Sequence, residues 1–271
     1  MNADSIFQIG KDHTVCEDYA LTGINKGITY AIVCDGCSAS ADVDFGARIM
    51  ALSAREILLH QVHNPLSFLR AKEFSVADFG NYTIDMAQKT VRMFPTLNPQ
   101  TLDTTLLIAW VKENMLTVYM FGDGVFVHRM ADGTHKVHIH LTSGAPDYLS
   151  YQLDPKRRAS YDLLPNNNKV VEVHYVSQIE VPSPSLKPFD PYSVTVPVKE
   201  GESISLISDG INSFRKPNNE VVDWKDLVDE FTGFKNFEGQ FVLRRIAAFK
   251  RKMAKENWHH LDDISIASIV I

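Results

Sequence analysis

The spacing of the hydrophobic residues predicts at least three helices. Residues 42–61 carry apolar side chains at i, i+4, i+7 and i+8, which places them along one face of a helix. A second helical stretch is predicted over about 77–93, and a third begins at Gly239, with Lys and Arg on its outer face. The apolar stripes consist of Met50, Ala54, Ile57 and Leu58 in the first helix, and of Val242, Ile246, Phe249 and Met253 in the third.

Short hydrophobic runs between polar turns predict strands. The runs 104–111 and 116–121 flank a polar turn at 112–114 and are expected to form a hairpin. Asp132-Gly133 is a strong hairpin signal between 125–130 and 136–141. Because the strands come mostly as hairpins, we expect two antiparallel sheets with the helices packed outside them. Further strands are predicted at 29–34, 170–176, 191–198, 203–208 and 264–271.

Neither a repeat nor a flexible linker interrupts this pattern, so residues 1–271 are expected to form a single domain. The stretch 142–169 is rich in Pro, Asn, Asp and Gly and is predicted to be a long irregular loop or flap insertion. It carries the basic run Lys156-Arg157-Arg158. This run has two interpretations, a solvated loop or a docking patch for an acidic phosphoprotein segment.

The composition excludes several classes of protein. The chain has a formal net charge of −6 and no basic face, which argues against a nucleic-acid partner. It contains no apolar run of about 18 residues, so we expect no membrane span. The first residues lack the pattern of a signal peptide, and three cysteines do not make a disulfide framework. A reduced, cytoplasmic setting is therefore expected.

Acidic residues recur where predicted strands end or begin. An Asp at a strand end projects beyond the sheet while its backbone stays held, and a following Gly allows a sharp turn. Several such carboxylates at one sheet edge would repel each other, and a hard divalent cation would relieve the repulsion. Each pair can equally be an ordinary turn, and spacing alone does not decide whether they converge. The acidic positions are Glu17-Asp18, Asp35-Gly36, Asp123, Asp209-Gly210 and Asp262-Asp263.

The order of these motifs resembles that of the PPM, or PP2C-type, metal-dependent protein serine/threonine phosphatases. The similarity extends from about Ile9 to Ile271. Each motif is weak alone, and the signal lies in their order and in the strands that surround them. The matching segments are 10–20 (GKDHTVCEDYA), 31–36 (AIVCDG), Thr104-Thr105, 118–124 (VYMFGDG), 206–210 (LISDG) and 262–265 (DDIS).

The resemblance implies an α+β fold, a PP2C-like four-layer α-β-β-α sandwich with two central antiparallel sheets flanked by helices. It also implies two Mn²⁺ or Mg²⁺ ions, with a third, weaker ion in some members. Asp35 would bridge the two ions and the Gly36 carbonyl would bind one of them. The other ligands implied are Asp209 and Asp262 for the second ion, Glu17 and Asp18 directly or through water, and Asp123 with Asp209 for the third.

By the same resemblance, a water that bridges the two ions would attack phosphoserine or phosphothreonine. The expected partner is a phosphorylated protein, with a cognate serine/threonine kinase. The catalytic set would be Asp35, Asp209, Asp262 and His13. The alternative is a catalytically weak regulatory or phosphopeptide-binding relative, although the complete set of carboxylates favours an enzyme.

The chain departs from the family pattern at several positions. His13 occupies the place of an Arg that holds the substrate phosphate, and we hypothesise that His13 helps to bind phosphate; a packing histidine is the other interpretation. Gly124 stands where Ser is usual and Asp263 where Asn is usual, and Cys37-Ser38-Ala39-Ser40 follows the first Asp-Gly.

Two further patterns have ordinary explanations. Cys34 and Cys37 have the spacing of redox and zinc sites, but coincidence is the better interpretation, with a reversible disulfide as the alternative. His138 and His140 would share one face of a strand, and a solvated face is favoured over a zinc site because no third ligand is evident.

Overall fold

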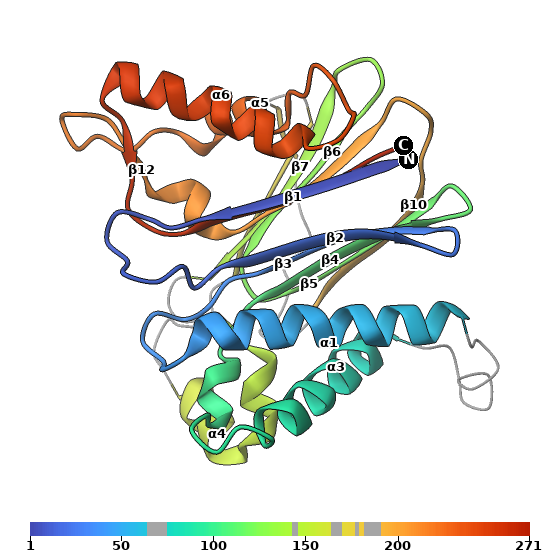
Figure 1. Cartoon of the computed structure of the whole chain (residues 1–271), viewed down its shortest axis with the longest axis vertical. Coiled ribbons are helices and arrows are strands. Elements are labelled where there is room, and N and C mark those ends of the chain that lie inside the picture. The colour runs from blue at the N-terminus through green and yellow to red at the C-terminus, as the bar shows by residue number, and fades with distance from the viewer. Residues whose placement is uncertain (64–74, 143–145, 164–169, 177–178, 182–190) are drawn as a thin grey trace.

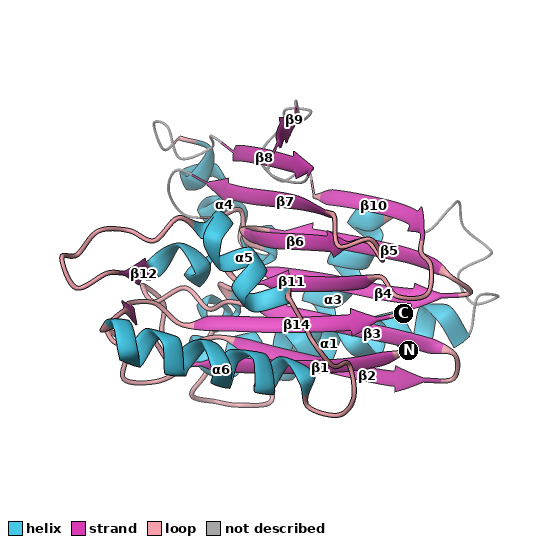
Figure 2. Ribbon diagram, turned by 90° about the horizontal axis from the view of Figure 1, so that it is seen from above, coloured by secondary structure: helices cyan, strands magenta, loops and turns pink. Residues whose placement is uncertain are grey.

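Two antiparallel sheets lie face to face, and helices cover both outer faces (Figures 1 and 2). The computed structural model describes residues 1–63, 75–142, 146–163, 170–176, 179–181 and 191–271. One sheet has seven strands in the order β1-β14-β11-β6-β7-β8-β9, and the other has five in the order β10-β5-β4-β3-β2. The predicted four-layer sandwich is confirmed.

The strands are short and joined mainly by tight turns. In the β4–β5 hairpin, Lys112 pairs with Met115, and the two turn residues Glu113 and Asn114 both have positive φ angles, as a two-residue hairpin turn requires. The seven-stranded sheet contains β1 (Asn2–Gln8), β6 (Gly124–Arg129), β7 (His135–Thr142), β8 (Val170–Val176), β9 (Ile179–Val181), β11 (Ser203–Ile207) and β14 (Ile264–Val270). The five-stranded sheet contains β2 (Tyr19–Asn25), β3 (Ile28–Cys34), β4 (Leu106–Lys112), β5 (Met115–Phe121) and β10 (Tyr192–Pro197).

The helices form two groups, one on each outer face (Figure 1). The group on the five-stranded sheet contains α1 (Val43–His63) and α3 (Val76–Val91), with η1 (Pro99–Leu102), η2 (Leu149–Leu153) and α4 (Pro155–Asp162) beside them. The group on the seven-stranded sheet contains α5 (Trp224–Thr232) and α6 (Phe241–Glu256). A short turn η3 (Asp209–Ser213) and the strand pair β12 (Phe214–Arg215) and β13 (His259–His260) complete the described elements.

The central strands are hydrophobic on both faces because each face is covered. All seven residues of β3 are buried. Side chains alternate along a strand, so Ile28 and Ile32 face the helices while Ala31 and Val33 face the other sheet. This double burial explains why 29–34 reads as a continuous apolar run rather than as an alternating pattern.

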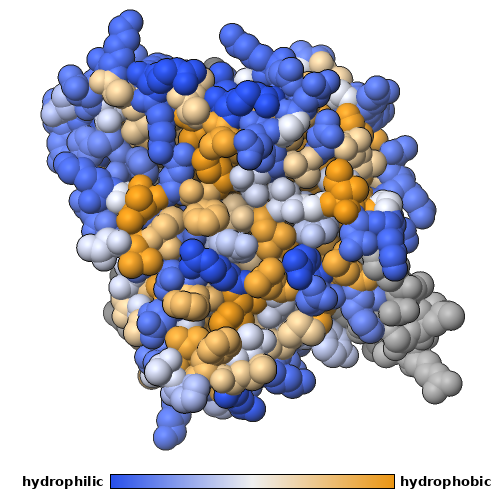
Figure 3. All heavy atoms as spheres, in the orientation of Figure 1, coloured by the Kyte–Doolittle hydropathy of each residue, from blue (hydrophilic) through white to orange (hydrophobic). Residues whose placement is uncertain are grey.

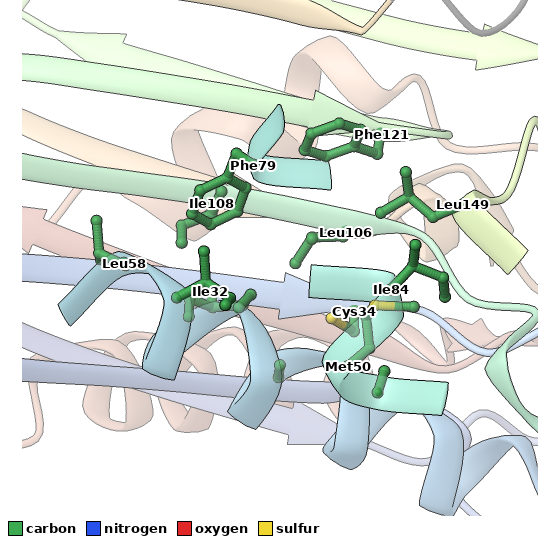
Figure 4. Close-up of a cluster of buried hydrophobic side chains, with 14 of the residues drawn as sticks. Ile32, Cys34, Met50, Leu58, Phe79, Ile84, Leu106, Ile108, Phe121 and Leu149 are labelled. Carbon is green, nitrogen blue, oxygen red and sulfur yellow. The ribbon is translucent and has the colours of Figure 1, made fainter. Parts of the chain in front are cut away.

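The apolar stripes of α1 and α3 pack on the outer face of the five-stranded sheet (Figure 4). Met50 and Leu58 of α1 are fully buried there, as are Phe79 of α3 and Ile108 of β4. Burying side chains of this size contributes roughly 1.5–3 kcal/mol each. The predicted stripe of the first helix therefore supplies one of the three hydrophobic clusters of the structure.

The edge strands β1 and β2 lie next to each other and close one side of the sandwich (Figure 1). Phe7 and Tyr19 contact each other with ring centroids 5.3 Å apart, and the guanidinium of Arg48 lies 5.6 Å from the Tyr19 ring centre. In the same view, hydrophobic and neutral residues gather across the middle of this face, whereas hydrophilic residues dominate over α6 (Figure 3).

The structure corrects several predictions from the pattern. Strands β1 and β2 and helix α5 were not predicted. The region 142–169 is not simply irregular, because it contains η2 and α4; its residues 143–145 and 164–169 lie outside the described part. The face that carries His138 and His140 is not solvated, since both residues are buried. Cys16, Cys34 and Cys37 are free thiols.

In the described residues, no helix combines the length and apolar character needed to cross a bilayer.

Gly46 is the point where α1 contacts η1, and it gives a test of this packing. A Cβ atom at position 46 would lie 1.6 Å from the carbonyl oxygen of Thr101. Replacing Gly by Ala within a helix usually stabilises by about 0.5–1 kcal/mol. We expect Gly46→Ala to do the opposite and to lower the melting temperature by about 4 °C or more, measured by calorimetry. The exposed α3 variant Asn81→Ala serves as the control and should not lower it; an equal effect of both would contradict the close contact.

Candidate metal centre

The acidic residues meet because the strand ends that carry them lie at one edge of the sandwich. Asp35 follows β3 directly, and Asp209 follows β11 after one residue. Strand β11 runs antiparallel to β14, with Ile207 opposite Ile266, so the end of β11 lies beside the start of β14. Asp262, two residues before β14, is thereby brought close to Asp209.

Asp123 occupies the connection between the two sheets. Strand β5 belongs to the five-stranded sheet and β6 to the seven-stranded sheet, and only Gly122 and Asp123 lie between the two strands. Gly122 and Gly124 have φ angles of 83° and 149°, a conformation that glycine adopts at little cost. The Gly-Asp-Gly sequence thus lets the chain cross between the sheets and leaves the Asp side chain at the site.

The backbone of Asp35 is held from both sides by Thr105. The Asp35 N–H donates to Thr105 Oγ1 at 3.0 Å, and the Thr105 N–H donates to the Asp35 carbonyl oxygen at 2.8 Å. Gly36 and Thr104 lie opposite each other as an isolated antiparallel bridge. These bonds extend the β3–β4 ladder past the strand end and fix the direction of the Asp35 side chain.

A cavity of about 440 Å³ opens at this edge. Five of the seven residues predicted to bind metal line it, and Glu17 and Asp18 do not. His13 is also outside the lining set, but its Nε2 lies 3.5 Å from the hydroxyl of Ser38, which is part of it. The lining residues are Asp35, Gly36, Cys37, Ser38, Ala39, Thr105, Asp123, Leu141, Pro146, Tyr148, Asp209 and Asp262.

Asp18 lies behind the cavity wall with only 1% of its surface exposed. The Ser208 hydroxyl donates to its Oδ2 at 2.7 Å. Ser208 is itself fixed to β14, because its N–H donates to the Ser265 carbonyl and its Oγ accepts from the Ser265 N–H. Asp18 therefore connects the N-terminal segment to the strand pair that carries Asp209 and Asp262.

Asp263 organises the N-terminal segment, a role that the sequence pattern did not reveal. Its carboxylate accepts hydrogen bonds from the N–H groups of Gly10 at 2.7 Å and Glu17 at 2.5 Å. His13 Nδ1 lies 3.0 Å from its Oδ2. The sequence offered one hint of this role, because Asp263, the second residue of the Asp262-Asp263 pair, stands where the family has Asn.

His13 stands between acidic groups. Two further carboxylates lie near the His13 ring: Asp262 is 3.4 Å from Nε2, and Glu17 is 3.9 Å from Nδ1. Partial burial lowers the pKa of His13, but the hydrogen bond and charge of Asp263, together with the charges of Asp262 and Glu17, outweigh it and raise the pKa above 6.5. His13 and Asp263, two of the departures from the family pattern, are thus in direct contact.

The carboxylates resist ionising together. Burial, followed by the charges of Asp18 and Asp209, raises the pKa of Asp35 well above its usual value. Burial raises the pKa of Asp18 to about 7, although the Ser208 hydrogen bond opposes this. Burial and the charge of Asp209 raise the pKa of Asp262 to about 6. Near neutral pH the site therefore favours a bound positive charge, either protons or a cation.

The donor set fits hard divalent ions, which prefer oxygen ligands. Two buried carboxylate oxygens, Asp18 Oδ1 and Asp209 Oδ1, have no hydrogen-bond partner. Within the described residues, however, no three His, Cys, Asp or Glu side chains already form a group that would hold one ion. The carboxylates line a shared space, and small side-chain movements would be needed to close on an ion.

Comparisons with known proteins identify the family and the fold. Residues 10–245 match the family model described as protein phosphatase 2C. Curated protein sequences gave no match.

Solved structures share the fold at low identity. A structure of RsbX in complex with magnesium matches with a TM-score of 0.52 and 11% identity over 98% of this chain and 92% of that one. PppA from Pseudomonas aeruginosa matches with a TM-score of 0.53 and 16% identity over 99% and 97%. The serine/threonine phosphatase PstP/Ppp from Mycobacterium tuberculosis matches with a TM-score of 0.52 and 14% identity over 98% and 96%. Because the family model spans most of the chain, this chain belongs to the protein phosphatase 2C family.

Proposed function

We propose that this protein hydrolyses phosphoserine and phosphothreonine esters in proteins with the help of two divalent ions, Mn²⁺ or Mg²⁺. The observation that carries the proposal is that Asp35, Asp123, Asp209 and Asp262, far apart in the sequence, line one cavity. Membership of the protein phosphatase 2C family supports it. The magnesium ion named in the RsbX structure supports the choice of metal.

Asp35 would contact both ions, and the Gly36 carbonyl would bind one of them. Asp209 and Asp262 would hold the second ion. Glu17 and Asp18 do not line the cavity, so a contribution through water suits them better than direct contact. Asp123, with Asp209, would hold a third, weaker ion.

When bound, the two ions would acidify a shared water and offset the charge of the phosphoryl group. The protein's own contribution is to hold the carboxylates in place. Thr105 fixes the backbone of Asp35, Ser208 orients Asp18, and Asp263 fixes the segment that carries Glu17. No cysteine or serine nucleophile is needed for attack by water, so the free Cys37 in the cavity wall requires no catalytic role.

His13 would bind the substrate phosphate in place of the family's Arg. Nδ1 of His13 lies 3.0 Å from Asp263, whereas Nε2 lies on the side of Asp262 and of Ser38 at the cavity wall. The raised pKa keeps more of the imidazole protonated near neutral pH. A protonated His offers one charged donor to phosphate, compared with the two-pronged donor of Arg.

The substrate would be a phosphorylated protein, and a serine/threonine kinase would supply it. The net charge of −6 argues against a nucleic-acid partner. A cytoplasmic site of action is part of the same proposal.

The central test is hydrolysis of p-nitrophenyl phosphate and of a phosphoserine peptide, with and without Mn²⁺. We expect metal-dependent turnover, and a loss of kcat/KM of at least about a hundredfold in Asp35→Asn and Asp209→Asn, because each removes a charged ligand. The matched control is Asp132→Asn, since Asp132-Gly133 is also an Asp-Gly turn but lies exposed at the β6–β7 hairpin. No metal-stimulated turnover in the wild type would favour the regulatory, phosphopeptide-binding alternative.

The role of His13 is tested separately. His13→Ala should raise KM for the phosphoester about five- to tenfold and change Mn²⁺ affinity less than twofold, because it removes a phosphate donor rather than a metal ligand. His13→Arg, which restores the usual family residue, should not raise KM. The exposed helix variant His60→Ala is the control. An unchanged KM in His13→Ala would rule out phosphate binding by this residue.

Metal binding should also depend on pH in a defined direction. The pKa values of Asp18 and Asp262, about 7 and about 6, exceed the value of about 3.9 expected in the unfolded chain. The folded protein therefore holds more protons than the unfolded chain between about pH 4 and 7. The stability these groups contribute is complete below pH 4 and is lost as the pH rises through their folded pKa values.

Mn²⁺ should replace the lost protons. At a hundredfold excess over Kd, we expect it to raise the melting temperature by about 5 °C or more at pH 7.5. The shift should be clearly smaller at pH 5, where protons compete. Calorimetry of the wild type, Asp35→Asn and Asp132→Asn would measure this; equal shifts at both pH values, or an undiminished shift in Asp35→Asn, would contradict the site.

A further inference from the structure

Asp103 is a buried carboxylate outside the proposed metal site, and three side chains from separate parts of the chain donate to it. It lies between η1 and β4, with 3% of its side chain exposed. The Ser150 hydroxyl donates to Oδ1 at 2.6 Å, and the Ser40 hydroxyl and Arg157 Nη2 each donate to Oδ2 at 2.7 Å. Both oxygens of the Asp103 carboxylate thus accept hydrogen bonds from named side chains.

Two hydrogen bonds to Asp103, one to its side chain and one to its backbone, hold one wall of the cavity. Cys37, Ser38 and Ala39 line the cavity directly after Gly36. The Cys37 N–H donates to the Asp103 carbonyl oxygen at 2.8 Å, and Ser40 donates to the Asp103 side chain. Asp103 therefore fixes both ends of the four-residue segment 37–40.

The other two bonds hold a second wall. Pro146 and Tyr148 line the cavity and lead into η2 and α4, which carry Ser150 and Arg157. The guanidinium of Arg157 also lies 4.8 Å from the ring centre of Tyr151. The Tyr151 ring lies 5.6 Å from the ring of Tyr148, which lines the cavity. Tyr151 therefore connects Arg157 to the cavity lining.

This geometry changes the interpretation of the basic run 156–158. Arg157 is directed inward, with 23% of its side chain exposed, and pairs with Asp103 across 54 positions of sequence. Arg158 pairs with Asp162 on the same helix. Lys156 is exposed. The three adjacent basic residues therefore have different environments, and Lys156 provides a matched control for Arg157.

A buried carboxylate is stable when a cation and hydrogen bonds compensate its charge. Without Arg157, Asp103 would have to take up a proton or admit water, and either change would disturb the bonds from Ser40 and Ser150 as well. A change that begins at α4 would in this way reach the segment 37–40 on the opposite side of Asp103.

We propose that Asp103 is a positioning residue, with Arg157 as its counter-ion. It couples the two cavity walls, 37–40 and 146–162, so that loss of the contacts in one wall also loosens the other. Its effect on turnover rests on the proposed phosphatase function. A peptide substrate that contacts both walls would depend on the coupling more strongly than a small aryl phosphate, which needs mainly the metal centre.

Hydrogen–deuterium exchange of the full chain tests the coupling without any assay of activity. In Arg157→Gln we expect amide exchange to accelerate about tenfold or more in both 37–40 and 146–162, with the β3–β4 strands unchanged. Lys156→Gln should alter neither segment, and Arg157→Lys, which keeps the charge, should restore most of the protection. Acceleration confined to 146–162, or none at all, would overturn the proposal.

Kinetics of the same variants test the consequence for substrates. Arg157→Gln should lower kcat/KM for a phosphoserine peptide at least threefold more than for p-nitrophenyl phosphate, mainly through KM. Equal losses on both substrates would refute a role in substrate positioning. If the wild type hydrolyses neither substrate, the proposed function fails while the exchange experiment still decides the coupling.

Discussion

The mutual repulsion of carboxylates at one edge of the sandwich is the constraint on which the structure of the site depends. Asp18, Asp35, Asp209 and Asp262 come from four segments. Burial raises the pKa values of Asp18, Asp35 and Asp262, and the charge of Asp209 raises those of Asp35 and Asp262 further. Such a group would disperse on a flexible scaffold. Here the backbone ladders of two sheets hold the residues that carry them, so the energy of the repulsion is available for binding cations.

The sandwich provides this rigidity through the same strands that form its core. Strand β3 buries every side chain and ends at Asp35, and β11 buries all five of its residues shortly before Asp209. Each carboxylate therefore follows a segment that is difficult to displace. The hydroxyls of Thr105 and Ser208 then fix the Asp35 backbone and the Asp18 side chain. Because so few residues separate the buried strands from the carboxylates, the packing of these strands fixes where the negative charges lie.

The sequence predicts the parts of the fold whose pattern is strong. Strands buried on both faces and helices with one apolar stripe were found within a few residues, and the Asp-Gly turns marked the strand ends. Strand β1 was missed because NADSIFQ has polar residues at most positions, and β2 because its pattern YALTGIN is broken by Gly23. Helix α4 was missed because it lies in a stretch with many turn-forming residues, although Asp154 caps it and Pro155 begins it.

The candidate site, like the fold, could be predicted only in part from the sequence. The strand-end carboxylates could be proposed from sequence, but the structural roles of Asp263 and Asp103 could not, because their partners lie far away in the chain. Asp263 contacts Gly10, His13 and Glu17 across about 250 positions, and Asp103 contacts Ser40, Ser150 and Arg157. No local pattern encodes such contacts, and only the folded chain reveals which acidic residues face the cavity and which hold its walls.

The contact between His13 and Asp263 gives the two family departures a common physical explanation. An Arg at position 13 would bring a permanent charge, whereas a His is charged only when its surroundings favour the proton. Asp263, which stands where the family has a neutral Asn, lies 3.0 Å from the ring of His13 and raises its pKa. In the proposed function, Asp263 would compensate for part of the charge that is lost with the Arg. Such compensation within one contact would favour a working phosphate site over an inactive relative.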